Sequence, residues 1–285
     1  MKNSLHSDSS LLPRPITPVT TSWTVVVSPG EKGGGLGGSV NLDLVGGQGN
    51  TAWHPVFGQV RYKVRELGWE PDEQVRRTVA LMREKVREDA KDPRFVQRAR
   101  GLFHNPQDQF GLVEQVWGHA KGGIRFQQDE EIGAGVGGLG EGDVIETIIR
   151  PQDMARYVDQ GIACGDCDDF SMYQAALLEA LGVPCAFVTV GADSRMPDQF
   201  SHVYVAAYPK DGNGEPVRVA LDASHGDYPG WEVPNRFGKY QEWAVGSPEM
   251  FSAAWVGNAV LQGIFVAGLW WLVKRMAGAR LGAVL

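Results

Sequence analysis

The sequence predicts an α+β fold in which a helix that begins at a cysteine packs on an antiparallel β-sheet. Apolar residues recur at helical spacing between residues 73 and 121, and again after the stretch "GDCDDF" at residues 165–170. Three runs of alternating or β-branched residues follow between residues 185 and 224, as in neighbouring strands of one sheet. Helices are expected on the N-terminal side of this unit, and a hydrophobic helix on its C-terminal side. With 285 residues, of which 43% are hydrophobic, the chain can bury such a core.

The N-terminal part of the chain is predicted to contain two segments. Residues 1–22 are rich in Ser and Pro and lack the apolar core of a secretory signal, so we expect a disordered arm. Residues 23–72 form a glycine-rich β and loop region that begins with the strand-like run "WTVVVSP". No Gly-Lys-Ser/Thr follows these glycines, which argues against a phosphate-binding loop.

The main folded domain is expected at residues 73–245, with a core at 107–225. Its first helix ends at Asp92-Pro93 and is followed by helices at 93–102 and 107–121. The first helix is indicated by four apolar residues on one face, namely Val75, Val79, Met82 and Val86.

The cysteine helix is expected at residues 166–181, with Gly182 as its stop signal. One apolar face carries Phe170, Tyr173, Leu177 and Leu181. Strands are predicted at 185–191, 201–208 and 217–224, and the turn "PKDGNGEP" joins the last two into a hairpin.

Charge and cysteine content exclude several classes of protein. The net charge of -7 and the pI of about 5.4 argue against a nucleic-acid partner, because phosphate binding needs a concentrated basic surface. Three cysteines are too few for the disulfide framework of a small secreted domain, which indicates a reducing compartment. No cofactor is expected.

The stretch "ACGDCDDFS" leaves three kinds of chemistry open. Cys164 and Cys167 have the spacing of a redox pair, although no strand-like run precedes them and aspartates follow Cys167. A zinc site would need Cys185 and His202 as further ligands, and these two residues lack a second paired-ligand spacing. In the third interpretation, Cys167 begins a helix whose positive end favours a nucleophilic thiolate.

A nucleophilic cysteine next to aspartates needs a histidine to activate it, and His202 is the best-placed candidate. His202 lies on a predicted strand, and Asp222 ends the neighbouring strand, so the two side chains can lie side by side. Cys167, His202 and Asp222 therefore match the logic of nucleophile, base and orienting acid. His225 competes for the role of base, but it lies in a turn that would hold it less rigidly.

These motifs resemble the transglutaminase-like superfamily. The resemblance rests on "GDCDDFSMYQAALLEALGVPCAFVTVG", "FSHVYV" and "ALDAS", which occur in the expected order. It points in particular to the transglutaminase-like cysteine-proteinase group of bacteria and tailed phages. Tyr204 stands where many relatives have Trp, and Gln160 is a candidate for a second oxyanion donor.

The resemblance implies a papain-like fold, with residues 73–245 as the catalytic domain. It also implies acyl transfer on peptide or protein amides, with Cys167 as nucleophile, His202 as general base and Asp222 as orienting residue. The setting it implies is a phage or prophage, in the host cytoplasm or the virion. The alternative is a virion-associated structural or interaction protein that uses this fold without turnover.

A hydrophobic helix is predicted at residues 250–275. No charged residue occurs from Met250 to Val273, which is long enough for a membrane span, and Lys274 and Arg275 follow. This segment is therefore the candidate for contact with a membrane or with a virion assembly, and a buried or oligomer-forming helix is the other interpretation.

Overall fold

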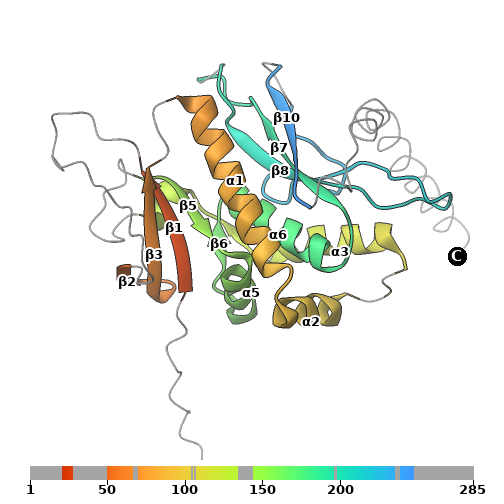
Figure 1. The fold of residues 1–285 in the computed structure, drawn as a ribbon, viewed down its shortest axis with the longest axis horizontal. Coiled ribbons are helices and arrows are strands. Elements are labelled where there is room, and N and C mark those ends of the chain that lie inside the picture. Colours follow the sequence, from red (N-terminus) through yellow and green to blue (C-terminus); the bar gives the residue numbers. More distant parts are fainter. Residues whose placement is uncertain are drawn as a thin grey trace, which may run out of the picture.

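The computed structural model describes residues 21–27, 50–66, 70–103, 105, 107–133, 144–195, 198–234 and 238–246. The described chain combines helices with three small sheets, which confirms the predicted α+β class. Figure 1 shows helix α6 (Cys167–Ala180) at the centre, with an N-terminal sheet on one side and a C-terminal sheet on the other. The predicted C-terminal helix at 250–275 and most of the arm at 1–22 lie outside the described residues.

The N-terminal sheet has the strand order β2-β3-β1-β5. Its strands are β1 (Thr21–Val27), β2 (Asn50–His54), β3 (Gly58–Glu66) and β5 (Val144–Ile149). Strand β1 runs parallel to β3 and antiparallel to β5. It covers the first five residues of the predicted "WTVVVSP" strand, Trp23 to Val27, and begins at Thr21, inside the predicted arm at 1–22. The last two residues of that run lie outside the described residues.

The helices before α6 follow the predicted order. They are α1 (Pro71–Asp89), α2 (Pro93–Leu102) and α3 (Gln109–Gly123). Both α1 and α2 begin with proline, whose fixed φ suits the first helical turn. Aspartates at the N-caps of α2 and α3 accept backbone N–H groups of the first turn.

Two further helices were not predicted, namely α4 (Asp129–Gly133) and α5 (Pro151–Gln160). Helix α5 begins with Pro151 and ends at Gly161, which has a left-handed φ of 69°. Both signals are visible in the sequence, since proline often starts a helix and glycine often ends one.

The C-terminal sheet is antiparallel throughout, with the order β10-β7-β8-β9. Its strands are β7 (Cys185–Val190), β8 (His202–Ala207), β9 (Val219–Leu221) and β10 (Tyr240–Ala244). Helix α6 packs on this sheet, as predicted. Strand β10 was missed because its residues are half-buried or exposed and it has no clear apolar alternation.

The alternation along β8 decides which side chains meet α6. Val203 and Val205 are buried in the main core with α6, whereas Tyr204 and Ala206 are buried in a smaller cluster. Because successive side chains on a strand point to opposite faces, these two clusters occupy the two sides of the sheet.

The main core joins the N-terminal sheet to the helices. Val60 of β3 and Ile148 of β5 are fully buried in the same cluster as Leu177 of α6. Residues 50–66 therefore pack as part of the same folded unit as the helices that follow. Among the described helices, none is both long enough and apolar enough to cross a membrane.

Candidate functional site

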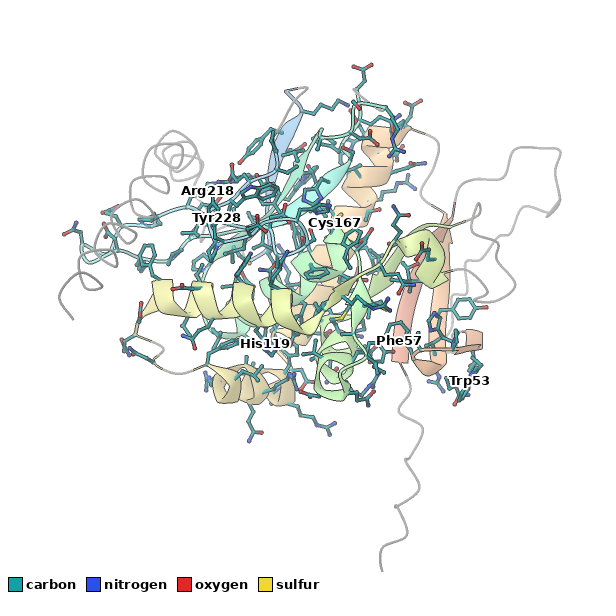
Figure 2. The ribbon with its side chains drawn as sticks, turned by 180° about the vertical axis from the view of Figure 1, so that it is seen from behind. Trp53, Phe57, His119, Cys167, Arg218 and Tyr228 are labelled. Atoms are coloured by element: carbon teal, nitrogen blue, oxygen red, sulfur yellow. The ribbon has the colours of Figure 1, made fainter. Side chains whose placement is uncertain are left out.

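Cys167 is the first residue of α6, and it is half-buried near the centre of the molecule (Figure 2). Asp166 is the N-cap, and its carboxylate accepts the backbone N–H of Asp168 at 3.0 Å. The cysteine is thus placed at the positive end of the helix dipole, next to backbone N–H donors of the first turn.

Gly165 and Asp169 of the "GDCDD" motif hold this helix start in place. The Asp169 carboxylate accepts the backbone N–H of Ile149, in β5, at 3.0 Å. Gly165 leaves room for that carboxylate, because a Cβ at residue 165 would lie 2.4 Å from Asp169 Oδ2. The glycine and this aspartate therefore have a structural role that the motif alone did not reveal.

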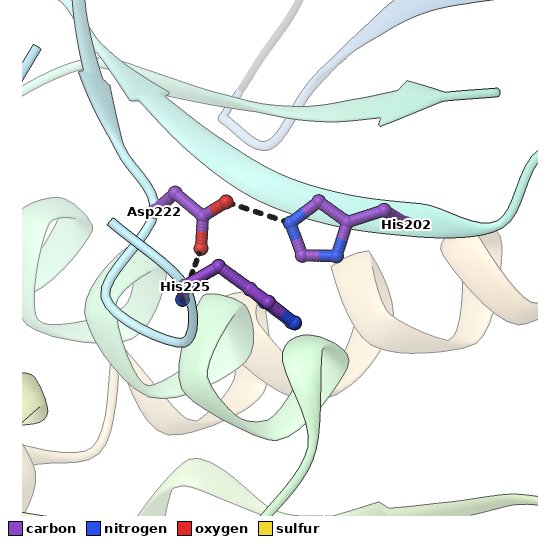
Figure 3. Close-up of side chains that lie close together, drawn as sticks. All are labelled: His202, Asp222 and His225. Atoms are coloured by element: carbon purple, nitrogen blue, oxygen red, sulfur yellow. Dashed lines mark hydrogen bonds and ion pairs between the residues drawn. The ribbon is translucent and has the colours of Figure 1, made fainter. Parts of the chain in front are cut away.

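His202 and Asp222 form a buried hydrogen-bonded pair (Figure 3). His202 is the first residue of β8, and Asp222 directly follows β9. The distance from His202 Nε2 to Asp222 Oδ2 is 2.7 Å, and the two residues are 8% and 1% exposed. A carboxylate only accepts hydrogen bonds, so Nε2 carries a proton, and Nδ1 is the nitrogen that can bind or release the second proton.

The Asp222 carboxylate has further donors that keep it charged. Burial acts to raise the pKa of Asp222, but the hydrogen bond and charge of His202 outweigh it and hold this pKa below its ordinary value. The backbone N–H of His225 and the hydroxyl of Ser224 donate to Asp222 Oδ1 at 3.0 and 2.8 Å. A separate bond holds the backbone of this residue, since the indole N–H of Trp117, in α3, donates to the backbone carbonyl of Asp222 at 3.3 Å.

His225 lies beside the pair but does not replace His202. Its ring contacts the His202 ring edge to face, with the centroids 4.8 Å apart. Its Nδ1 is paired with Ser224 Oγ at 2.9 Å, while its backbone N–H is the group that faces Asp222 (Figure 3). Burial lowers the pKa of His225, and the nearby charge of His202 acts in the same direction.

Two connections bring the start of α6 to this pair. The Ser171 hydroxyl, one turn after Cys167, contacts the carbonyls of Cys167 and Val203 at 2.6 and 3.3 Å. Val203 is the neighbour of His202 on β8. Strand β6 (Cys164–Gly165), which leads into Cys167, pairs in parallel with β4 (Arg125–Phe126), and the Phe126 ring contacts that of His225. These contacts link the start of α6 to the strand of His202 and to the ring of His225.

The other two cysteines are buried. All three thiols are free. Burial raises the pKa of Cys164 to about 11, and the positive charge of Arg125 opposes this effect only in part. Cys185 is fully buried, and this burial together with Glu179 raises its pKa well above the ordinary value. A redox pair of Cys164 and Cys167 would need an accessible low-pKa thiol, which Cys164 does not provide.

Within the described residues, two groups of side chains bring three potential metal ligands within 4.8 Å of one another. One group is His202, Asp222 and His225, and the other is Asp129, Asp168 and Asp169. Neither group contains a cysteine, so the zinc interpretation based on the three cysteines and His202 gains no support.

One further candidate residue and one cavity complete the description of this region. Gln160, the candidate oxyanion donor, is exposed at the end of α5. A cavity of about 570 Å³ is lined by the end of α6 from Glu179 to Gly182, together with Arg100, Phe103 and Leu112. At 1.5 Å per residue, Glu179 lies about 18 Å along the helix from Cys167.

Comparisons with known proteins add little to the description of this site. No protein-family model matches the chain, and no curated protein matches it. A solved structure, "a Putative Cysteine Protease from Cytophaga hutchinsonii", is similar with a TM-score of 0.33 and 14% sequence identity. The match covers 56% of this chain and 53% of that one, so it spans about half of each protein. Similarity at this level assigns neither a family nor an activity to this chain.

Proposed function

We propose that the protein is a cysteine-dependent acyl-transfer enzyme of the transglutaminase-like, papain-like type that acts on peptide or protein amides. Cys167 is the nucleophile, His202 the general base and Asp222 the residue that orients the imidazole. The observation that carries this proposal is the buried 2.7 Å hydrogen bond between His202 Nε2 and Asp222 Oδ2. The proposal is supported by a histidine that is hydrogen-bonded to a buried carboxylate and lies on a strand that packs against the cysteine-bearing helix, because such a pair can activate a thiol.

The first half of the reaction forms a thioester. His202 Nδ1 takes the proton of the Cys167 thiol, and the sulfur attacks the amide carbonyl carbon. Backbone N–H groups at the start of α6 stabilise the negative charge that develops on the carbonyl oxygen. The C–N bond then breaks, and the proton passes from His202 to the leaving amine.

The second half of the reaction releases the acyl group. His202 removes a proton from water or from an amine, which attacks the thioester carbonyl and expels the Cys167 thiolate. Water gives a carboxylic acid, as in a protease or amidase, and an amine gives a new amide, as in cross-linking. Throughout both halves, the Asp222 carboxylate stabilises the imidazolium form of His202.

Selective alkylation tests the nucleophile. We expect iodoacetamide at neutral pH to modify Cys167 much faster than Cys164 and Cys185, because those two thiols are buried and have raised pKa values. The His202→Ala variant should lose this preference. His119→Ala is the matched control, because His119 bonds to Tyr173 in the helical layer and should leave the labelling unchanged. Slow and equal labelling of all three thiols in the wild type would disprove the proposal.

A product assay separates the two outcomes of the reaction. Peptide substrates are incubated with and without a primary amine, and the products are identified by mass spectrometry. Free carboxylic acids in both reactions indicate hydrolysis, and amine adducts indicate transfer. Absence of either product across a broad peptide library, with selective labelling intact, would favour a binding role over turnover.

A further inference from the structure

Within the described residues, the short strand β4 has one edge that is paired and one edge that no other strand covers. The backbone N–H of Arg125 donates to the Ala163 carbonyl at 3.0 Å, and that of Gln127 donates to the Gly165 carbonyl at 2.9 Å. Successive residues of a strand direct their backbone groups to opposite edges, so the N–H and C=O of Phe126 point away from β6. This sheet consists of β4 and β6, so no strand in the described part of the chain pairs with the outer edge of β4.

The open edge lies next to the site described above. The centroid of the Phe126 ring is 5.3 Å from that of His225, whose ring in turn contacts His202. On the other side, Phe126 is paired with Gly165, two residues before Cys167. A chain segment that paired with Phe126 would therefore lie beside the ring of His225, one strand away from the residues that lead into Cys167.

The Phe126 side chain is unusually exposed for its type and position. It is 44% exposed, whereas most large apolar side chains of the described residues are buried. Arg125 beside it is exposed as well. An exposed aromatic ring next to an open strand edge is what an extended peptide needs, because main-chain hydrogen bonds supply affinity and a side-chain contact supplies selectivity.

We propose that an extended peptide segment of the substrate binds as an added strand on the outer edge of β4. Its carbonyl accepts the N–H of Phe126, its N–H donates to the C=O of Phe126, and one of its side chains packs on the Phe126 ring. This inference rests on the proposed function and narrows its substrate class. The substrate is a flexible or unfolded stretch of polypeptide with an accessible backbone, and not a small isolated amide.

Peptidyl electrophiles test the backbone contact on the full-length protein. The probe is the chloromethyl ketone of Ala-Phe-Ala, and chloroacetone is the matched small electrophile with the same reactive group. In both reactions, the Cys167 sulfur forms a C–S bond and chloride leaves. We expect the peptidyl probe to alkylate Cys167 at least tenfold faster than chloroacetone, since it gains main-chain hydrogen bonds that chloroacetone lacks.

N-methylation of each amide of the probe locates the contact. Methylation at one position should lower the alkylation rate about tenfold or more, which is the rate change expected for one hydrogen bond of about 1.4 kcal/mol. Methylation at the remaining positions should have little effect. If all methylated probes react at the rate of the parent, or if the parent is no faster than chloroacetone, the inference is wrong.

A substitution at Phe126 tests the same contact from the side of the protein. Phe126→Pro removes the backbone N–H but leaves those of Arg125 and Gln127 for pairing with β6, and Phe126→Ala keeps the N–H and removes the ring. The proline variant should lose the rate advantage of the peptidyl probe and keep the chloroacetone rate. The alanine variant should keep the dependence on N-methylation. If the proline variant does not fold, the N-methyl series decides alone.

The two proposals fail in different ways. If Cys167 is not labelled selectively by iodoacetamide, the proposed function is wrong, and the strand-addition inference, which rests on it, is wrong as well. Selective labelling without any dependence on the probe backbone would overturn the strand-addition inference alone.

Discussion

At the scale of single residues, Asp222 is the acidic group on which the site depends most directly. The Asp222→Asn variant keeps the shape of the side chain but removes the charge that stabilises the imidazolium of His202 and selects its tautomer. We expect kcat/KM on a cleaved peptide to fall about 10³- to 10⁴-fold. Asp72→Asn, a change of the same kind on exposed α1, is the control and should leave kcat/KM within about twofold of the wild type.

The same carboxylate makes stability depend on pH. Because the folded-state pKa of Asp222 is lowered, its stabilising contribution is present above the ordinary carboxyl pKa of about 4 and is lost as the pH falls through the folded-state value. The free energy of unfolding of the wild type should therefore fall more steeply between pH 6 and pH 3 than that of Asp222→Asn. Urea unfolding at several pH values measures both curves, and parallel curves would contradict this expectation.

Gly165 is required by close packing and not by its backbone conformation. In Gly165→Ala, the new Cβ would lie 2.4 Å from Asp169 Oδ2 and 2.5 Å from Asp169 Cβ, so Asp169 must move from its bond to Ile149. We expect a loss of about 1–3 kcal/mol in the free energy of unfolding.

Gly118→Ala, in the exposed part of α3, is the matched control for Gly165→Ala. A Cβ there has no neighbour within 4 Å, so the change should stabilise the protein by about 0.5–1 kcal/mol through helix propensity alone. Equal effects of the two substitutions in urea unfolding would show that residue 165 has no special packing requirement.

At the scale of elements, the start of α6 determines where the nucleophile lies. Asp166→Ala removes the cap from the Asp168 N–H and should cost about 1 kcal/mol of stability. Because Cys167 is the next residue, its alkylation rate should also change. Asp92→Ala removes a matching cap from α2, where Asp92 accepts the Arg94 N–H at 2.7 Å, and should lower stability without changing that rate. Identical labelling rates in both variants would show that the Asp166 cap does not affect the reactivity of Cys167.

At the scale of the whole molecule, the N-terminal sheet and the helices share one core. Val60→Ala in β3 should lower the free energy of unfolding by about 1–3 kcal/mol, because this side chain is fully buried. If the core is a single cooperative unit, the urea midpoints from circular dichroism and from exposure of the buried Cys185 thiol should shift together. Separate transitions would show that residues 50–66 unfold independently.

Much of the architecture followed from local pattern. The helix at 93–102 begins with a capping aspartate and a proline, and the helix at 167–180 begins with a capping aspartate and is followed by Gly182. Strand β8 was recognisable from its two alternating faces. Helix α5 carried its end signals but lies beyond a glycine-rich stretch, and β10 had no periodic signal, so neither was predicted.

The sequence by itself determined the α+β class, the helix that begins at Cys167, and the choice of His202 and Asp222 as an interacting pair on neighbouring strands. These follow from short-range periodicity and from strands joined by one turn. Only the tertiary structure decided that Asp222 faces His202 Nε2 while His225 contributes its backbone N–H, that Gly165 makes room for Asp169, and that Phe126 presents an open edge beside His225. Each of these contacts depends on the direction of a side chain or joins segments that are far apart in the sequence. Local sequence patterns do not specify them, because the packing of the whole core brings these residues together.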